Sequence, residues 1–127
     1  MRGIVSILCN RLENGIWTYH IDEVWSGLQS CFAELKANVK KEYDVELTNI
    51  GAIGISAMMH GYLVFDENNQ LLAPFRTWRN TITEEAAARL SALFGKNIPQ
   101  RWSIAHLARA MMLHEEHLPS LCRLTTL

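Results

Sequence analysis

Short apolar runs separated by polar turns predict several β-strands in the first half of the chain. Residues 4–8 are apolar and partly β-branched, which favours a strand. Asn14-Gly15 is a dipeptide typical of tight turns, and residues 16–21 after it have the composition of a second strand. We therefore expect a β-hairpin at the N-terminus.

Residues 50–57 form a run with apolar side chains on both alternating faces. Such a run predicts a strand that is buried on both sides, as in the parallel or mixed sheets of α/β proteins. Gly51 and Gly54 within it indicate close approach of another element. Beyond it, residues 62–65 and 70–73 flank a polar turn, which predicts a second hairpin.

A long amphipathic helix is predicted between the two strand regions. It begins at Asp22, whose carboxylate suits an N-cap, and extends to about Tyr43. Its apolar residues recur at intervals of three and four, so they share one face of the helix. That stripe consists of Val24, Leu28, Cys31, Phe32, Leu35 and Val39.

Two further helices are predicted near the C-terminus. One begins around Thr81 with acidic residues in its first turn and ends at Gly95. The other begins with Ser103 as its N-cap and is stopped by Pro119. The expected buried faces are Ile82, Ala86, Leu90, Leu93 and Phe94 in the first, and Ile104, Leu107, Ala108 and Met111 in the second.

The order of these elements predicts a single α/β domain over residues 1–127, with a mixed sheet and flanking helices. The balance of 12 basic and 13 acidic residues argues against a nucleic-acid partner. No apolar run is long enough to span a bilayer, and the N-terminus does not resemble a signal peptide. Three widely spaced cysteines are typical of reduced thiols, so we expect a cytoplasmic protein.

The end of the apolar run at residues 50–57 is the first candidate site. Ligands of α/β proteins collect beyond the carboxyl ends of strands, and here that end carries Met59, His60 and Gly61. On spacing alone, His60 also fits an ordinary hydrogen-bonded residue at a strand end. No phosphate-binding Gly-rich motif and no Gly-x-Ser-x-Gly nucleophile motif is present.

The second candidate is an indole among hydrogen-bond donors. Trp78, Arg79 and Asn80 follow one another, and such groups can hold the hydroxyls of a ligand. A core tryptophan with solvated arginines is the alternative interpretation of the same residues.

In their order, these segments resemble the FGGY carbohydrate kinases, and the xylulokinase-like members in particular. The resemblance rests on Ser56-Ala57-Met58-Met59-His60-Gly61, on Pro74-Phe75-Arg76-Thr77-Trp78, and on the later segment Pro99-Gln100-Arg101-Trp102-Ser103. It extends from about Ile16 to the C-terminus.

The resemblance implies part of an actin-like (ribonuclease-H-like) domain of an enzyme that phosphorylates a sugar or polyol with MgATP. By the same resemblance, Met59, His60 and Gly61 line the sugar pocket, and Trp78, Arg79 and Asn80 close one side of it. His60 would hydrogen-bond a hydroxyl, while Trp78 packs on the carbon skeleton.

Several parts of the family pattern differ or are missing. Asn80 and Ile82 stand where xylulokinases have an acid and an arginine, and Met58 stands where glutamine is usual. The Asp-x-Gly-Thr strand that faces the phosphates, the aspartate general base and the adenosine site have no counterpart. We therefore expect a kinase fragment with no catalytic residue, no bound cofactor and no activity of its own.

Two other interpretations remain open at this point. His106, His114 and His117 lie within a helical spacing near Glu115 and Glu116, but they lack the His-Glu-x-x-His pattern of zinc sites, and a solvated helix end with mixed charge is the favoured explanation. A kinase-derived interaction module is the other alternative, because missing strands would leave a sheet edge through which copies could associate.

Overall fold

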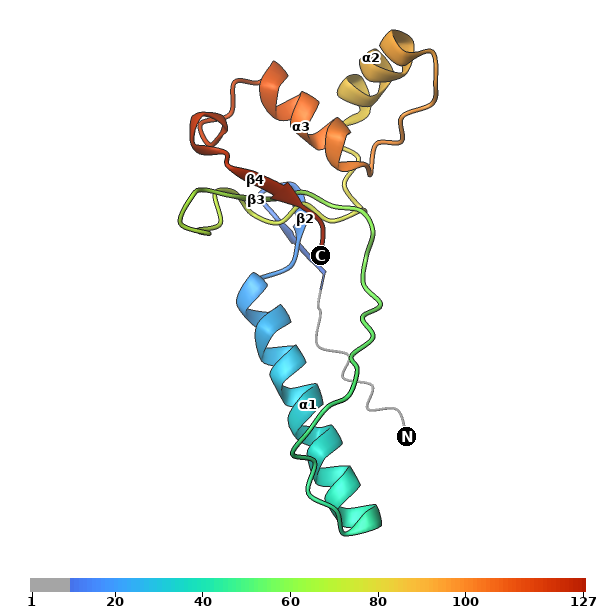
Figure 1. The fold of residues 1–127 in the computed structure, drawn as a ribbon. Coiled ribbons are helices and arrows are strands. Elements are labelled where there is room, and N and C mark those ends of the chain that lie inside the picture. Colours follow the sequence, from blue (N-terminus) through green and yellow to red (C-terminus); the bar gives the residue numbers. More distant parts are fainter. Residues whose placement is uncertain (1–9) are drawn as a thin grey trace. The chain divides into compact units, whose positions relative to one another are not determined.

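The computed structural model describes residues 10–127, in the element order shown in Figure 1. These residues divide into two compact units. The main unit contains Asn10–Tyr19 and Ala57–Leu127, and the helical unit contains His20–Ser56. Among the described residues, no helix combines the length and apolar character needed to cross a membrane.

Helix α1 (Ile21–Tyr43) dominates the helical unit. Acidic Asp22 and Glu23 lie in its first turn and two lysines in its last, which complements the helix dipole. The predicted N-cap at Asp22 is wrong, because His20 occupies that position without a side-chain hydrogen bond. At the other end, Asp44 adopts the left-handed conformation and its N–H donates to the Lys40 carbonyl.

The predicted strand at residues 50–57 is wrong. These residues form an irregular extended segment with no strand partner in the part of the chain that the structure describes. Ile53 and Ile55 are 74% and 87% exposed. An apolar run becomes a strand only when neighbouring strands satisfy its backbone. The stripe on α1 is likewise uncovered, since no residue of that helix is buried.

A β-hairpin opens the main unit, as the Asn14-Gly15 turn predicted. Strands β1 (Arg11–Glu13) and β2 (Ile16–Thr18) pair antiparallel, with Leu12 opposite Trp17. Asn14 and Gly15 both have positive φ, at 50° and 79°, as this type of tight turn requires. The predicted first strand at residues 4–8 lies outside the described residues.

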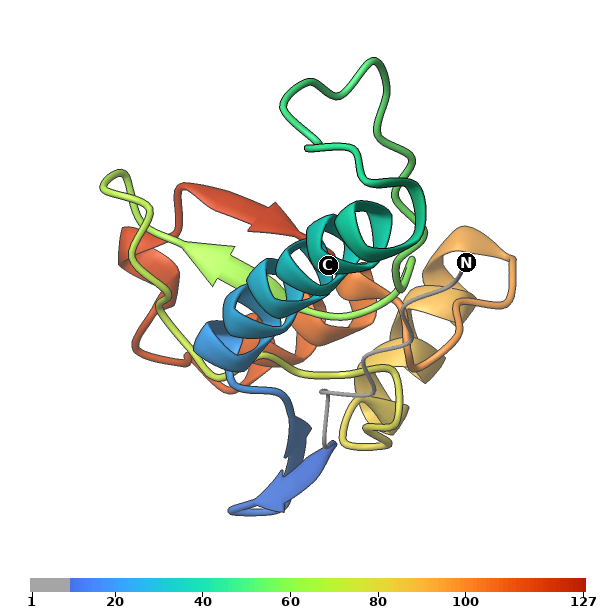
Figure 2. The same ribbon diagram turned by 90° about the horizontal axis from the view of Figure 1, so that it is seen from below.

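The second sheet joins segments that are far apart in sequence. Strand β3 (Leu63–Phe65) pairs antiparallel with β4 (Arg123–Thr125), and Figures 1 and 2 show the two side by side. The predicted second hairpin is only partly formed. Its two arms are joined where the Leu72 N–H donates to the Val64 carbonyl. The sequence did not predict β4. Two separate two-stranded sheets therefore replace the expected mixed sheet within residues 10–127.

Helices α2 (Glu84–Phe94) and α3 (Ser103–Met112) pack against each other (Figure 2). Gly95 ends α2 in the left-handed conformation, as predicted. Pro119 does not stop α3, which ends earlier, but lies in a short 3₁₀ turn, η1 (Leu118–Ser120).

The predicted buried faces of these two helices are partly wrong. The buried residues at the contact between α2 and α3 are small, apart from one histidine, His106. Alanines allow the two helices to approach closely, and several larger apolar side chains that were expected to be buried are exposed. The buried residues are Ala86, Ala87, Ala105, His106 and Ala110, and the exposed ones are Leu93, Phe94, Ile104 and Met111.

The core of the main unit contains a charged group. Arg76 is only 4% exposed, and its guanidinium lies 4.9 Å from the centre of the Tyr62 ring. Glu115 neutralises it by accepting from Arg76 and also from Arg109, the latter at 2.7 Å. The Tyr62 hydroxyl pairs with Nε2 of His117 at 2.7 Å. This network connects β3, the segment before α2 and the turn after α3.

His106 is fully buried within the same network and stacks on Tyr62 at 5.9 Å. Neither ring nitrogen has a hydrogen-bond partner among residues 10–127. Burial lowers its pKa from 6.5 to about 4, and the positive charges of Arg76 and Arg109 act in the same direction. Burial also lowers the pKa of His117. Both effects favour the neutral imidazole in the folded chain.

Acid should therefore destabilise the main unit. Between pH 6.5 and about 4 the unfolded chain binds more protons than the folded chain, so the free energy of unfolding falls as the pH drops through this range. His106 alone accounts for about 3 kcal/mol of this loss. Urea unfolding followed by circular dichroism at several pH values measures it.

The variant His106→Phe should flatten this pH dependence, leaving the smaller contribution of His117. His114→Asn is the matched control, because His114 is exposed and asparagine tolerates its positive φ of 51°. A slope that is equal in His106→Phe and in the unchanged chain would contradict the assignment.

Candidate functional site

Two segments that were predicted to carry the site lie next to each other in the main unit. Tyr62 and Arg76 exchange backbone hydrogen bonds of 2.9 and 3.2 Å. This pairing places Met59, His60 and Gly61 on the segment that leads into β3, beside the segment that carries Trp78. The structure thus brings together two motifs that the sequence separates.

Gly61 is buried, and the Phe75 ring occupies the space that a side chain at this position would need. Its φ is +142°, and a Cβ atom there would lie 2.6 Å from the Phe75 ring. The Ser103 hydroxyl donates to its carbonyl at 2.6 Å, which holds the start of α3 against this segment. Ser103 was predicted as an N-cap, but Trp102 takes that position and the Ser103 hydroxyl makes this tertiary contact instead.

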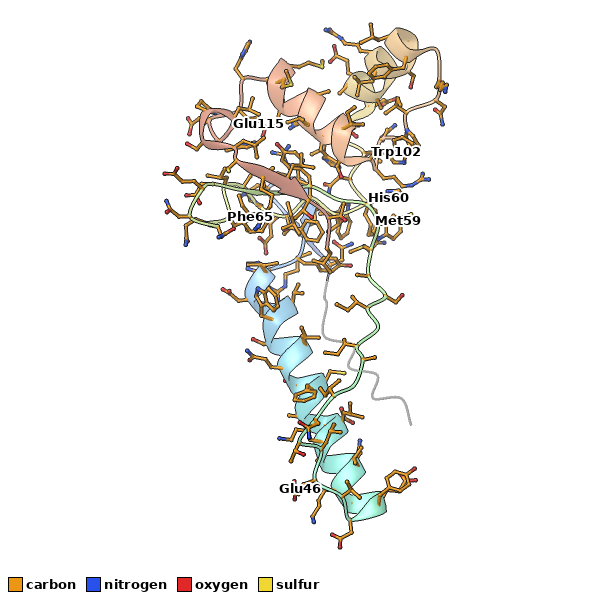
Figure 3. All side chains as sticks on the ribbon, viewed as in Figure 1. Glu46, Met59, His60, Phe65, Trp102 and Glu115 are labelled. Carbon is orange, nitrogen blue, oxygen red and sulfur yellow. The ribbon has the colours of Figure 1, made fainter. Side chains whose placement is uncertain are left out.

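Met59 and His60 differ in exposure. Met59 is 76% exposed, whereas His60 is half-buried. Figure 3 labels both in the part of the main unit where Trp102 precedes α3. A half-buried imidazole can exchange hydrogen bonds with a ligand without losing all contact with water.

Trp78 offers half of its surface to solvent, at 49% exposure. The guanidinium of Arg79 lies 4.7 Å from the ring centre of Trp17, on the β1–β2 hairpin, and 5.9 Å from that of Trp78. The sequence did not identify Trp17 as part of this site, because nothing in its local pattern links the hairpin to residues so distant in the chain.

Asn80 is buried and its amide is committed to the hairpin. Its Oδ1 accepts from the Trp17 N–H at 2.8 Å, and its Nδ2 donates to the carbonyls of Trp17 and Thr77 at 2.8 and 2.9 Å. Both amide protons are therefore used within the protein. Asn80 fixes the position of its neighbours Trp78 and Arg79, and its donors are not free for a ligand.

A groove of about 590 Å³ opens beside Trp78, between α2 and the loop at residues 97–101. Two hydroxyls on the α2 side hold this loop. Thr83 donates to the Gln100 carbonyl at 2.6 Å, and Ser91 accepts from the Ile98 N–H at 2.8 Å. Because the loop is tied to the helix at both ends, the groove has fixed walls.

The groove carries groups that suit a hydroxylated ligand. Oε1 of Gln100 is buried and has no hydrogen-bond partner in the part of the chain described. Glu84, Asn97 and Arg101 add a carboxylate, an amide and a guanidinium, and Trp78 adds an aromatic face. Of the six residues predicted from the sequence, Trp78 and Asn80 line the groove, and Met59, His60, Gly61 and Arg79 do not.

The histidines and glutamates near the C-terminus form no metal centre in residues 10–127, where no three His, Cys, Asp or Glu side chains gather around a common point. His117 lies 3.5 Å from Glu115 and bonds Tyr62, while His106 stacks inside the core. His106 and His117 therefore both contact Tyr62 in the core of the main unit.

Comparison with known proteins places the chain in a family. A model of the N-terminal domain of the FGGY family of carbohydrate kinases matches residues 7–121. The chain therefore belongs to the FGGY family of carbohydrate kinases, as its motifs indicated.

A solved structure has the same fold. The crystal structure of a xyloylose kinase from Brucella ovis superposes with a TM-score of 0.75 at 20% sequence identity. The match covers 91% of this chain and 24% of the kinase, so the chain spans about a quarter of that protein's length. No curated protein matches the chain in sequence.

Replacing Gly61 should destabilise the main unit. Gly61→Ala puts a methyl group against the Phe75 ring and the Arg76 carbonyl in a backbone conformation that disfavours any side chain, so we expect a loss of about 2–3 kcal/mol. A thermal melt measures it. Gly54→Ala is the control, since its Cβ meets open space and φ is unrestrictive. Equal melting temperatures of the two variants would contradict the steric conflict at Gly61.

Replacing Asn80 should release the hairpin. Asn80→Ala removes the partner of the Trp17 N–H and one of the two donors to the Trp17 carbonyl, which keeps the Thr77 N–H, at a cost of about 2 kcal/mol. Hydrogen exchange of the Trp17 amide should accelerate markedly. Asn97→Ala, in an exposed residue of the groove, should leave both stability and exchange unchanged. Slow exchange at Trp17 in Asn80→Ala would refute the reciprocal pairing.

Proposed function

We propose that this chain is part of an ATP-dependent sugar or polyol kinase and supplies one wall of the sugar pocket. The observation that supports this proposal is the half-exposed Trp78, which lies beside a groove lined by groups that can bind hydroxyls, in a chain of the FGGY family. Sugar sites combine an aromatic face for the C–H surface of the ring with amides and carboxylates for its hydroxyls.

In this proposal the residues have distinct tasks. Trp78 packs against the carbon skeleton from the groove. His60 lies outside the groove, on the segment paired with the one that carries Trp78, and hydrogen-bonds a hydroxyl as the family resemblance implies. Asn80 and Gly61 are positioning residues, because their groups are used within the protein. An acceptor hydroxyl held in one place by such contacts is the contribution of a pocket wall to phosphoryl transfer.

We propose that ATP and Mg²⁺ serve the intact kinase and that this chain alone holds neither. No step of the reaction is assigned to either group on this chain. In the proposed kinase the nucleotide, the metal and the general base belong to an actin-like domain pair of which this chain is one part, acting in the cytoplasm.

A second candidate, an interaction module, is favoured by one observation. Along α1 the large apolar side chains Trp25, Leu28, Phe32 and Leu35 are 42–61% exposed. Exposed apolar surface of this kind marks contact sites between proteins. Sedimentation of the chain over a range of concentrations distinguishes the candidates, since self-association without sugar binding favours this second function.

Sugar binding should raise the melting temperature of this chain, because a ligand that binds only the folded state stabilises it. A panel of ketoses and polyols at high concentration, followed by circular dichroism, supplies the measurement. Trp78→Ala should abolish the shift. Trp25→Ala removes another exposed indole, on α1, and should leave the shift intact. A shift that survives Trp78→Ala, or no shift with any member, would count against the proposed pocket wall.

A further inference from the structure

Helix α1 carries large apolar side chains at alternating intervals of four and three residues. These intervals form the heptad pattern of coiled coils, in which the first and fourth residues of each heptad, positions a and d, face a partner helix. We call these residues the seam of α1. Its four central members are 42–61% exposed. The seam consists of Ile21, Trp25, Leu28, Phe32, Leu35 and Val39.

The two flanks of the seam differ in exposure. On one flank, Val24 and Cys31 are half-buried within the helical unit. The other flank is exposed along its whole length and consists of Asp22, Gln29 and Lys36, which occupy position e of successive heptads. A partner helix can therefore approach the seam from this second flank.

The spacing of the seam is symmetric about its middle, so the seam is complementary to a second copy of itself that runs in the opposite direction. One antiparallel register places each seam residue opposite a seam residue of the second copy. An interface with two-fold symmetry requires this kind of self-complementary surface. The facing pairs are Ile21 with Val39, Trp25 with Leu35, and Leu28 with Phe32.

The charges beside the seam favour the same register. It places Asp22 of each copy next to Lys36 of the other, and within residues 10–127 neither side chain has an ion-pair partner. Lys40, in contrast, is already paired with Asp44 at 2.8 Å. The acidic first turn of one helix also meets the basic last turn of the other. A parallel pair would hold Asp22 and Lys36 about 21 Å apart along the axis.

We propose that α1 binds the α1 helix of a second copy of this chain as an antiparallel pair, with Leu28 and Phe32 packed next to the two-fold axis. The inference goes beyond the proposed kinase function, because it concerns a surface other than the groove beside Trp78. It also gives the exposed side chains of α1, which favour the second candidate function, a defined partner and register.

Sedimentation equilibrium of the full chain tests the surface, and circular dichroism checks that each variant is folded. We expect an equilibrium between monomer and dimer. Leu28→Gln removes an apolar side chain from both central pairs and should weaken dimerisation about a hundredfold or more. The single chain tolerates this change, because Leu28 is 61% exposed in it. Leu93→Gln is the control: Leu93 is 75% exposed on α2, and its replacement should leave the dimer unchanged.

Charge reversal tests the direction and the register of the pair. At low ionic strength, Asp22→Lys and Lys36→Glu should each weaken dimerisation about tenfold, because each variant places like charges next to each other at two points. The double variant Asp22→Lys/Lys36→Glu should restore most of the affinity. The two residues are too far apart to touch within one helix, so this rescue requires the second copy. Glu34→Lys, an equal change of charge at an exposed position off the seam, is the control.

Four results would overturn the inference. A chain that stays monomeric up to about 1 mM does not use the seam for self-association. A trimer or larger assembly contradicts a two-helix pair. A dimer that Leu28→Gln leaves intact forms through another surface, and a dimer that the double charge reversal does not restore lacks the antiparallel register. None of these results affects the proposed pocket wall, which the melting shift with sugars tests separately.

Discussion

The buried guanidinium of Arg76 is the constraint on which the main unit depends. A charge with 4% exposure is tolerated only when a partner neutralises it, and Glu115 provides that partner from the turn after α3. The Arg76 backbone pairs with Tyr62, so one residue connects β3, the Trp78 segment and the C-terminal turn. Losing the carboxylate would leave the buried charge of Arg76 without its partner, which destabilises the fold strongly.

The candidate site is built outward from this core. Asn80 joins the loop to the hairpin, Thr83 and Ser91 join α2 to the loop at residues 97–101, and Ser103 joins α3 to Gly61. Each link is a short polar side chain bonded to a distant backbone group, which sets position more narrowly than apolar packing does. The half-exposed Trp78 stands among these links, so its orientation is set by residues that touch no ligand.

Structural features that depend on neighbouring residues in the sequence were predicted, whereas features that depend on contacts between distant residues were not. Asn14-Gly15 gave the hairpin turn and Gly95 gave the end of α2, because such residues adopt positive φ regardless of their surroundings. The strand at residues 50–57 failed because pairing depends on strands elsewhere. The inward face of α3 was misjudged because His106 is polar in sequence but buried in the fold. Among site residues, Trp78 was found through its motif, whereas Trp17 and Gln100 join the site only through tertiary contacts.

The pairing of β3 with β4 has a consequence for biosynthesis. The chain leaves the ribosome from its N-terminus, and β3 emerges long before the residues at 123–125 that complete its sheet. The hairpin likewise waits for Asn80, 63 residues away. Helix α1, whose helical backbone hydrogen bonds join residues four apart, can form during this interval, whereas the contacts of the main unit form only after long loops have closed, at a cost in chain entropy. The nascent chain therefore spends much of its synthesis with an open strand edge, the state in which chaperones are most needed.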